Sequence, residues 1–111
     1  MARTALTVNQ VLYTGFTRSL SAANADGHSV VNDGKTWIEV ANASGGSINV
    51  TVQTAGTVDG RAVADDVIAI ANGATKLIGP WPTHLYNQST ADGVYVDFSA
   101  VSSVTCAAYK L

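Results

Sequence analysis

The fold is decided by residues 36–81, which read TWIEVANASGGSINVTVQTAGTVDGRAVADDVIAIANGATKLIGPW. Gly-rich and Asn-Gly breaks divide this stretch into apolar runs. In the clearest run, residues 47–54, Ile48, Val50 and Val52 alternate with polar residues. A period of two residues gives an extended chain one apolar face and one polar face, as in a half-buried strand. The run therefore predicts a strand that buries Ile48, Val50 and Val52.

The rest of the chain repeats this pattern of short extended runs between turn residues. A helix would need apolar residues at i, i+3, i+4 and i+7, and the segment that comes closest, 62–70, contains β-branched residues that favour strands. We count about eight or nine short strands, a number typical of sandwiches and barrels. The sequence therefore predicts an all-β fold: a single antiparallel β-sandwich, jelly-roll-like or Ig-like, with two sheets and little or no helix.

Individual segments carry more specific expectations. Residues 94–99 alternate in the same way, so Val94, Val96 and Phe98 are expected to face the core. Residues 85–87 are expected to add a short strand. Asp59-Gly60 marks a turn within the longest polar connection, 55–66.

Length and composition narrow the classes of function. A chain of 111 residues predicts one domain, 1–111. Charged residues make up 13 % of it, the net charge is −2, and no Lys/Arg cluster is present, so neither nucleic acid nor an anionic membrane surface is expected as a partner. No run approaches the roughly 18 apolar residues of a membrane span, and no export signal is expected.

The residues that carry chemistry elsewhere form no recognisable motif here. Cys106 is the single cysteine and lies in an apolar run, which favours a small buried side chain over a reactive thiol. His28 and His84 lack the spacing of a zinc site. The acidic residues lack the spacing of a calcium loop, which favours solvated turn acids at Asp59, Asp65, Asp66, Asp92 and Asp97. There is no GxSxG elbow and no phosphate-binding loop. We expect no enzymatic activity, no metal and no cofactor.

Aromatic side chains suggest two kinds of binding surface. Trp37, Trp81, Tyr86 and Tyr95 could stack on a sugar, as aromatic residues on a β-sandwich face do in carbohydrate-binding modules. Trp81, however, stands between two prolines at a chain corner, where an exposed aromatic residue more often meets another protein chain. The corner is therefore predicted to be a stiff apolar projection at a protein interface, while Trp37 is expected in or beside the core.

Four phrases of the sequence resemble small proteins of tailed bacteriophages encoded among the head genes. They are NDGKTWIEVANASG (32–45), SINVTVQTAGTVDG (47–60), ANGATKLIGPWP (71–82) and LYNQS (85–89). These are structural phrases without active-site residues, and the similarity covers roughly residues 30–105. The family is one of capsid-associated β-sandwich proteins of the head decoration or cement kind.

The resemblance implies a non-enzymatic virion protein that is made in the bacterial cytoplasm and binds the outer capsid surface. Its partners would be the major capsid protein and further copies of itself, most simply a trimer at three-fold positions. A tail or neck component and a carbohydrate-binding module remain the alternatives. Residues 1–7 are predicted to form a flexible arm. The residues predicted at the interface are Trp81, Pro80, Pro82, Tyr86, Arg3 and Leu6.

Overall fold

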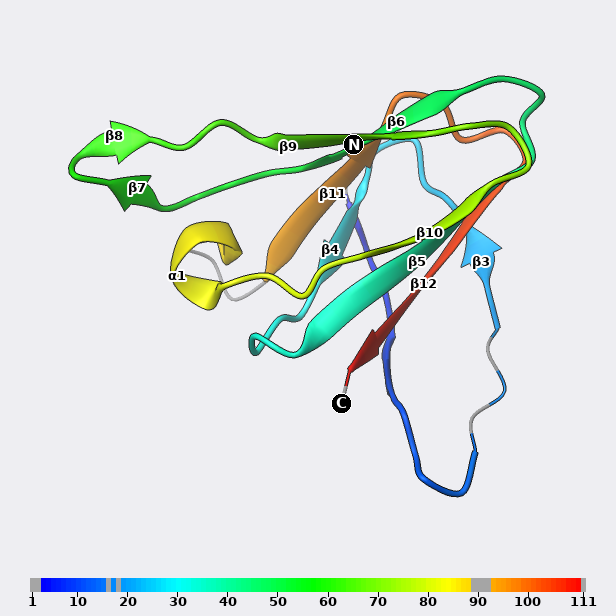
Figure 1. Ribbon diagram of the computed structural model, residues 1–111, viewed down its shortest axis with the longest axis horizontal. Helices are drawn as coiled ribbons and strands as arrows, with labels where there is room; N and C mark the ends of the chain where they lie inside the picture. The colour runs from blue at the N-terminus through cyan, green and yellow to red at the C-terminus, as the bar shows by residue number, and fades with distance from the viewer. Residues whose placement is uncertain (1–2, 16, 18, 89–92, 111) are drawn as a thin grey trace.

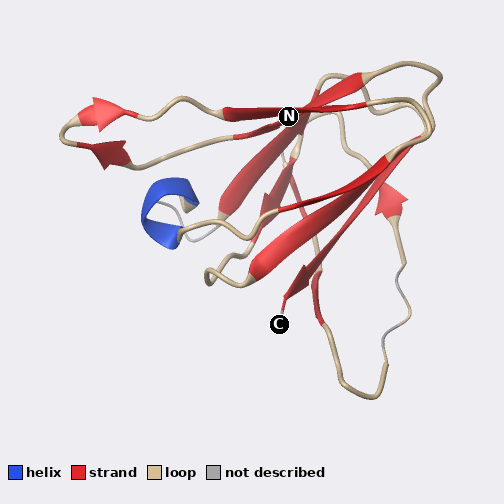
Figure 2. Cartoon of the chain, viewed as in Figure 1, coloured by secondary structure: helices blue, strands red, loops and turns tan. Residues whose placement is uncertain are grey.

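The predicted strands lie in two sheets that pack against each other (Figure 1, Figure 2). The computed structural model describes residues 3–15, 17, 19–88 and 93–110. The order in sheet A is β1 (Thr4–Ala5), β4 (His28–Val30), β11 (Val94–Phe98), β6 (Ile48–Val52) and β9 (Asp66–Ile70). The order in sheet B is β10 (Thr75–Ile78), β5 (Thr36–Asn42), β12 (Val104–Lys110) and β2 (Val8–Gln10), and β3 (Ser21–Ala22) also pairs with β12.

The core fills the space between the sheets with small branched aliphatic side chains. The predicted inward residues Ile48, Val50 and Val52 are buried, and so are Val94 and Val96. Phe98 at the end of β11 is half-buried and packs against the core. Sheet B contributes its buried side chains from three strands, namely Ile38, Val40, Ile78, Val104, Cys106 and Ala108. The alternating pattern therefore identified the buried faces of β6 and β11, whereas β5 and β12 each bury more residues.

The predicted all-β sandwich is confirmed, and in addition to its antiparallel pairs it contains two parallel ones, so its sheets are mixed. The central pairs are antiparallel, whereas β1 runs parallel to β4 and β2 runs parallel to β12. The N-terminal segment first lies along sheet A and then crosses to sheet B. Periodicity shows which face of a strand is buried, but it carries no information on the direction of the neighbouring strand.

The same segment corrects the prediction of a flexible arm over residues 1–7. The backbone N–H of Thr4 donates to Gly27 O at 3.2 Å, and that of Leu6 donates to Ser29 O at 2.8 Å. Leu6 also packs against the core. Residues 3–7 are therefore part of the sandwich, and Met1 and Ala2 lie outside the described residues.

Two local elements differ from the sequence prediction. A hairpin of β7 (Thr57–Val58) and β8 (Arg61–Ala62) forms within the expected connection, around a turn in which Asp59 and Gly60 both have positive φ. The single helical turn α1 (Thr83–Tyr86) replaces the strand expected at 85–87. Of the twelve strands in the described chain, four (β1, β3, β7 and β8) have two residues, which leaves eight longer ones.

Candidate functional site: a groove between two edge strands

The corner after β10 turns the chain inward. Gly79 has φ +118°, and a Cβ at this position would lie 3.0 Å from Thr36 O, so the close passage over β5 requires glycine. The Gly79–Pro80 peptide bond is cis. Trp81 follows with only 4 % of its surface exposed, whereas Pro80 and Pro82 are exposed. The prediction that Trp81 projects from the surface is therefore wrong, because its large indole packs into the core.

Two asparagines, Asn32, which is buried, and Asn87, which is half-buried, fix this corner. Asn32, which is 5 % exposed, donates from Nδ2 to Trp81 O and to Asn87 Oδ1, both at 3.0 Å. Asn87 Nδ2 donates in return to Asn32 O at 2.9 Å. The pair ties the end of β4 to both sides of α1. In the sequence Asn32 reads only as the last residue of a short strand, 28–32, before the Asp33-Gly34 turn, so a structural role for its side chain could not be inferred.

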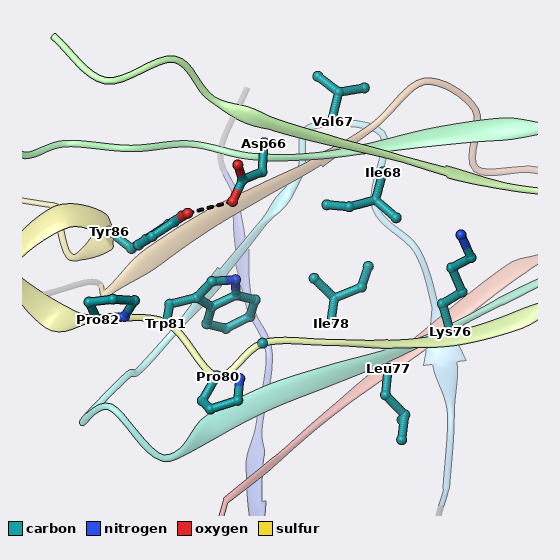
Figure 3. Close-up of a pocket in the computed structure, with 11 residues that line it drawn as sticks. Asp66, Val67, Ile68, Lys76, Leu77, Ile78, Pro80, Trp81, Pro82 and Tyr86 are labelled. Atoms are coloured by element: carbon teal, nitrogen blue, oxygen red, sulfur yellow. Dashed lines mark hydrogen bonds between the residues drawn. The ribbon is translucent and has the colours of Figure 1, made fainter.

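A groove of about 440 Å³ opens between β9 and β10. These strands are the edges of sheets A and B, so the sandwich is open on this side. Ile68 and Ile78 point toward each other across the groove, and Trp81 lies beside them (Figure 3). Val67 and Leu77 point away from it, onto the outer faces of their sheets (Figure 3). The groove combines apolar side chains with polar groups, and the edge strands on its two sides are places where another chain can pair.

Two polar contacts close the ends of the groove. The Tyr86 hydroxyl donates to the Asp66 carboxylate, and this hydrogen bond, with partial burial, raises the pKa of Tyr86 to about 12. On the other side, Lys76 Nζ donates to Ala69 O at 2.8 Å and so bridges β10 to β9. Both charged groups of the rim therefore already have a partner within the chain. Of the predicted interface residues, Trp81, Pro80, Pro82 and Tyr86 all line this groove.

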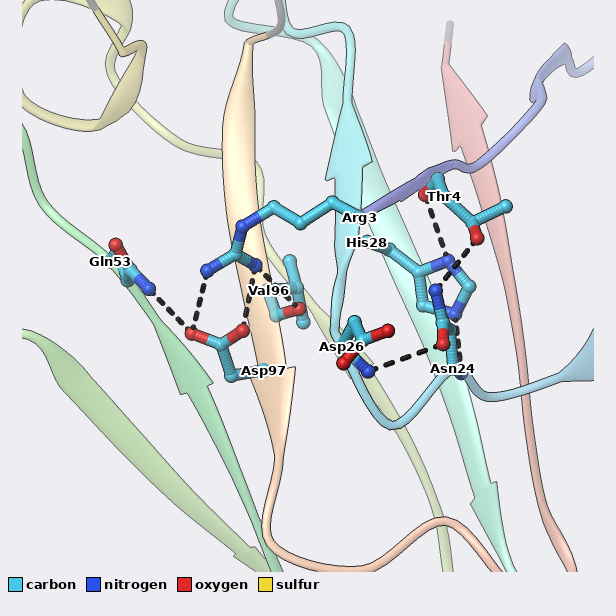
Figure 4. Close-up of polar contacts among 8 residues, drawn as sticks. All are labelled: Arg3, Thr4, Asn24, Asp26, His28, Gln53, Val96 and Asp97. Carbon is cyan, nitrogen blue, oxygen red and sulfur yellow. Dashed lines mark hydrogen bonds and ion pairs between the residues drawn. The ribbon is translucent and has the colours of Figure 1, made fainter. Parts of the chain in front are cut away.

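The other two predicted interface residues, Arg3 and Leu6, lie elsewhere. The Arg3 guanidinium forms a bidentate ion pair with Asp97, at 2.6 and 3.2 Å (Figure 4). It also lies 4.3 Å from the centre of the Tyr95 ring. Gln53 donates to the same carboxylate. These contacts join the N-terminal segment to β11 and to the end of β6. Arg3 is therefore engaged with its own chain, as is Leu6 through the core.

His28 joins the N-terminal segment to the turn before β4. Its Nε2 accepts the backbone N–H of Asn24 at 3.1 Å, so the ring proton is on Nδ1, which donates to Thr4 O at 3.1 Å (Figure 4). Burial lowers the pKa of His28, and the bond to Thr4 offsets part of this shift. The neutral ring is the form that fits both partners, because a second ring proton would face the Asn24 N–H.

The loop between β2 and β3 carries three consecutive exposed apolar side chains, of which Tyr13 is the most exposed large apolar residue of the described chain. Val11 and Leu12 are 40 % and 52 % exposed, and Tyr13 is fully exposed. The loop extends well away from both sheets at the bottom of Figure 1. In the sequence these residues read as the end of a first strand and a bend, so the exposure was missed. Large apolar residues are also exposed elsewhere, at Val31, Val58, Val67 and Leu77.

The other candidate residues are accounted for individually. Cys106 is fully buried in β12, and burial raises the pKa of its thiol to about 11. Within the described ranges no three His, Cys, Asp or Glu side chains are grouped to hold a metal ion, and Asp92 lies outside those ranges. Trp37 is half-buried, with its ring 6.0 Å from that of Tyr109. No helix in the described part of the chain is long and apolar enough to cross a membrane.

Comparison with known proteins adds no relative. No family model, no curated protein and no solved structure matches this chain. The protein is therefore classified by its fold alone, as a mixed β-sandwich with one open side and an exposed apolar loop.

Proposed function

We propose that this chain is a non-enzymatic structural protein of a bacteriophage virion, which binds the outer surface of the head and stabilises it. The resemblance of residues 32–45, 47–60, 71–82 and 85–89 to capsid-associated phage proteins is the source of the proposal. Its partners in this role are the major capsid protein and further copies of itself.

The observation that carries the proposal is the exposed apolar surface on a chain with few charges. Seven large apolar side chains of the described residues are exposed, while only 13 % of the sequence is charged. Interface cores are poor in Lys, Glu and Asp and rich in apolar side chains, so such a surface suits contacts with other protein chains. When many copies bind one shell, weak individual contacts act together and the overall affinity is high.

The sugar-binding alternative has lost its main support. It predicts that Trp81, Tyr86 or Tyr95 lies exposed on a common flat patch. Trp81 is buried, the Tyr86 hydroxyl is bonded to Asp66, and the Tyr95 ring is covered on one side by Arg3. A tail or neck component would use the same exposed apolar side chains to contact other protein chains, but it would lie elsewhere in the virion.

The test locates the chain in the virion and removes it. Virions of a phage that carries the gene would be separated into heads and tails, and each fraction analysed by mass spectrometry. We expect the chain on heads, at symmetric positions visible by cryo-electron microscopy. Heads made without it should lose DNA at a lower temperature, and adding purified protein should restore their resistance. Finding the chain only in the tail fraction, or in neither fraction, would contradict the proposal.

A further inference from the structure

Two apolar features of the described chain lie at opposite edges of the same sheet. In sheet B, β10 is one edge and β2 is the other. The groove borders β10, whereas the loop with Val11, Leu12 and Tyr13 directly follows β2. One copy of the chain therefore presents a protruding apolar loop on one side and an open apolar groove on the other (Figure 1, Figure 3).

The first residue of the 11–15 loop is bonded to sheet B, and a turn forms within the loop. The backbone N–H of Val11 donates to Lys110 O at 2.9 Å, and that of Gly15 donates to Leu12 O at 3.1 Å. The strands on both sides of the loop, β2 and β3, pair with β12. A loop fixed in this way loses less conformational freedom on binding than a free segment would.

The groove and the loop are matched in charge. Residues 11–15 carry no charge. The two charged residues of the groove rim, Asp66 and Lys76, are bonded to Tyr86 and to Ala69 O, while Ile68 and Ile78 face the opening. Asp66 and Lys76 are both exposed at the rim, so an apolar side chain that enters between the isoleucines would not require either charge to be buried.

We propose that the groove between β9 and β10 receives the 11–15 loop of a second copy of this chain, with Leu12 and Tyr13 as the inserted side chains. Because the two surfaces differ, the contact is head-to-tail, and each copy acts as both donor and acceptor. Repeated contacts of this kind close into a ring when the rotation between copies allows it. A single loop in a groove of about 440 Å³ is a small contact, so free protein associates weakly and concentration on a shell promotes the assembly. The head-to-tail contact does not depend on the proposed function. Closure of the ring as a trimer, which the resemblance to phage head proteins implies, does depend on it.

The experiment uses two complementary variants of the full chain. The loop variant, Leu12→Ser with Tyr13→Ser, removes the donor and changes only exposed residues. The groove variant, Lys76→Trp, fills the acceptor from an exposed position on its rim. Val58→Ser, which removes an exposed apolar side chain from the β7–β8 hairpin, is the matched control. Circular dichroism verifies the fold of each, and sedimentation velocity and native mass spectrometry measure their association.

We expect the wild type and Val58→Ser to associate with rising concentration, and each of the two variants alone to be monomeric. Mixing the loop variant with the groove variant leaves one intact loop and one intact groove, so a 1:1 heterodimer should form and grow no further. If mixing restores nothing, the interface is a symmetric one, such as β9 paired with its own copy, and the proposal is overturned. A wild type that stays monomeric up to its solubility limit also overturns it.

This outcome is separate from the location in the virion. Protein that associates as described but never binds heads would remove the proposed function and keep the head-to-tail contact. If instead the loop variant covers heads as completely as the wild type and forms no rings there, the proposed function would stand and the head-to-tail contact would be removed.

Discussion

Because Trp81 is buried, substituting it should affect the stability of the fold. Its indole is part of the core and also borders the groove. We expect Trp81→Ala to lower the free energy of unfolding by about 3–5 kcal/mol, because it leaves a large cavity. Leu77→Ala, at an exposed neighbouring position on β10, should change it by no more than about 0.5 kcal/mol. Urea unfolding followed by circular dichroism measures both, and equal effects would contradict the burial of Trp81.

His28 should make stability depend on pH. Its pKa in the folded protein lies below the ordinary value of 6.5, because burial disfavours the charged ring. The unfolded chain therefore takes up the proton first, so the contribution of His28 is fully present above pH 6.5 and is lost as the pH falls through the lowered folded pKa. The free energy of unfolding should be constant from pH 8 to 7 and decrease below 6.5.

The control for this prediction is the second histidine. His84 is exposed on α1, so His84→Gln should keep the pH dependence. His28→Gln should reduce it in the same interval, although its stability at pH 8 falls too, since the bonds to Thr4 O and Asn24 N change. A pH profile that is the same for both variants would show that another group is responsible.

At the scale of elements, α1 is held by a close backbone contact. The N–H groups of Ala55 and Gly56 both donate to Leu85 O, at 2.8 and 2.9 Å. A Cβ on Gly56 would lie 2.2 Å from His84 O, a distance that forces the helical turn to move. Gly56→Ala should therefore destabilise the protein by roughly 1–3 kcal/mol.

The matched control for Gly56→Ala is the same substitution at Gly46. It lies in the turn before β6, where an added Cβ meets nothing within 4 Å. Gly46→Ala should leave the thermal midpoint within about 3 °C of the wild type, given the usual effect of a surface change in a domain of this size. If the two alanine variants melt together, the contact between residue 56 and α1 is not rigid.

The elements that sequence analysis predicted correctly share one physical property. β6 and β11 each have one face in the core, so selection for burial leaves a period of two in the sequence. β1, β3, β7 and β8 are two residues long and exposed, and so leave no such pattern. The β7–β8 hairpin was recognisable only by its Asp59-Gly60 turn.

The candidate site was predictable only in part, for a related reason. The four residues of the corner, Pro80 to Pro82 and Tyr86, were identified and do line the groove. Which way Trp81 points depends on Asn32 and Gly79, whose contacts come from β4 and β5, far away in the sequence. The other side of the groove is formed by β9. This strand lies opposite β10 only because it pairs with β6 in sheet A and the two sheets pack against each other.

For the whole molecule, the N-terminal segment is a structural part of the sandwich. Deleting residues 1–7 removes β1 from the edge of sheet A together with the contacts of Arg3. We expect a marked loss of stability in urea, larger than the loss of about 0.5–1 kcal/mol for Arg3→Gln, which removes only a partly exposed ion pair. A deletion variant as stable as the wild type would restore the interpretation of this segment as a free arm.

The place of β12 in sheet B has a consequence for synthesis. β12 separates β5 from β2 and also pairs with β3, so residues 8–10, 21–22 and 36–42 all depend on residues 104–110. On a ribosome that adds about 5–20 residues per second, the early strands wait roughly 5 to 20 seconds for their common neighbour. During that time β5 can pair with β10, whose residues 75–78 are made earlier, but the other edge of β5 has no neighbour. A chain that stops before residue 104 would leave these strands without their common neighbour and open to proteases and chaperones, so only chains completed through β12 would reach the folded state.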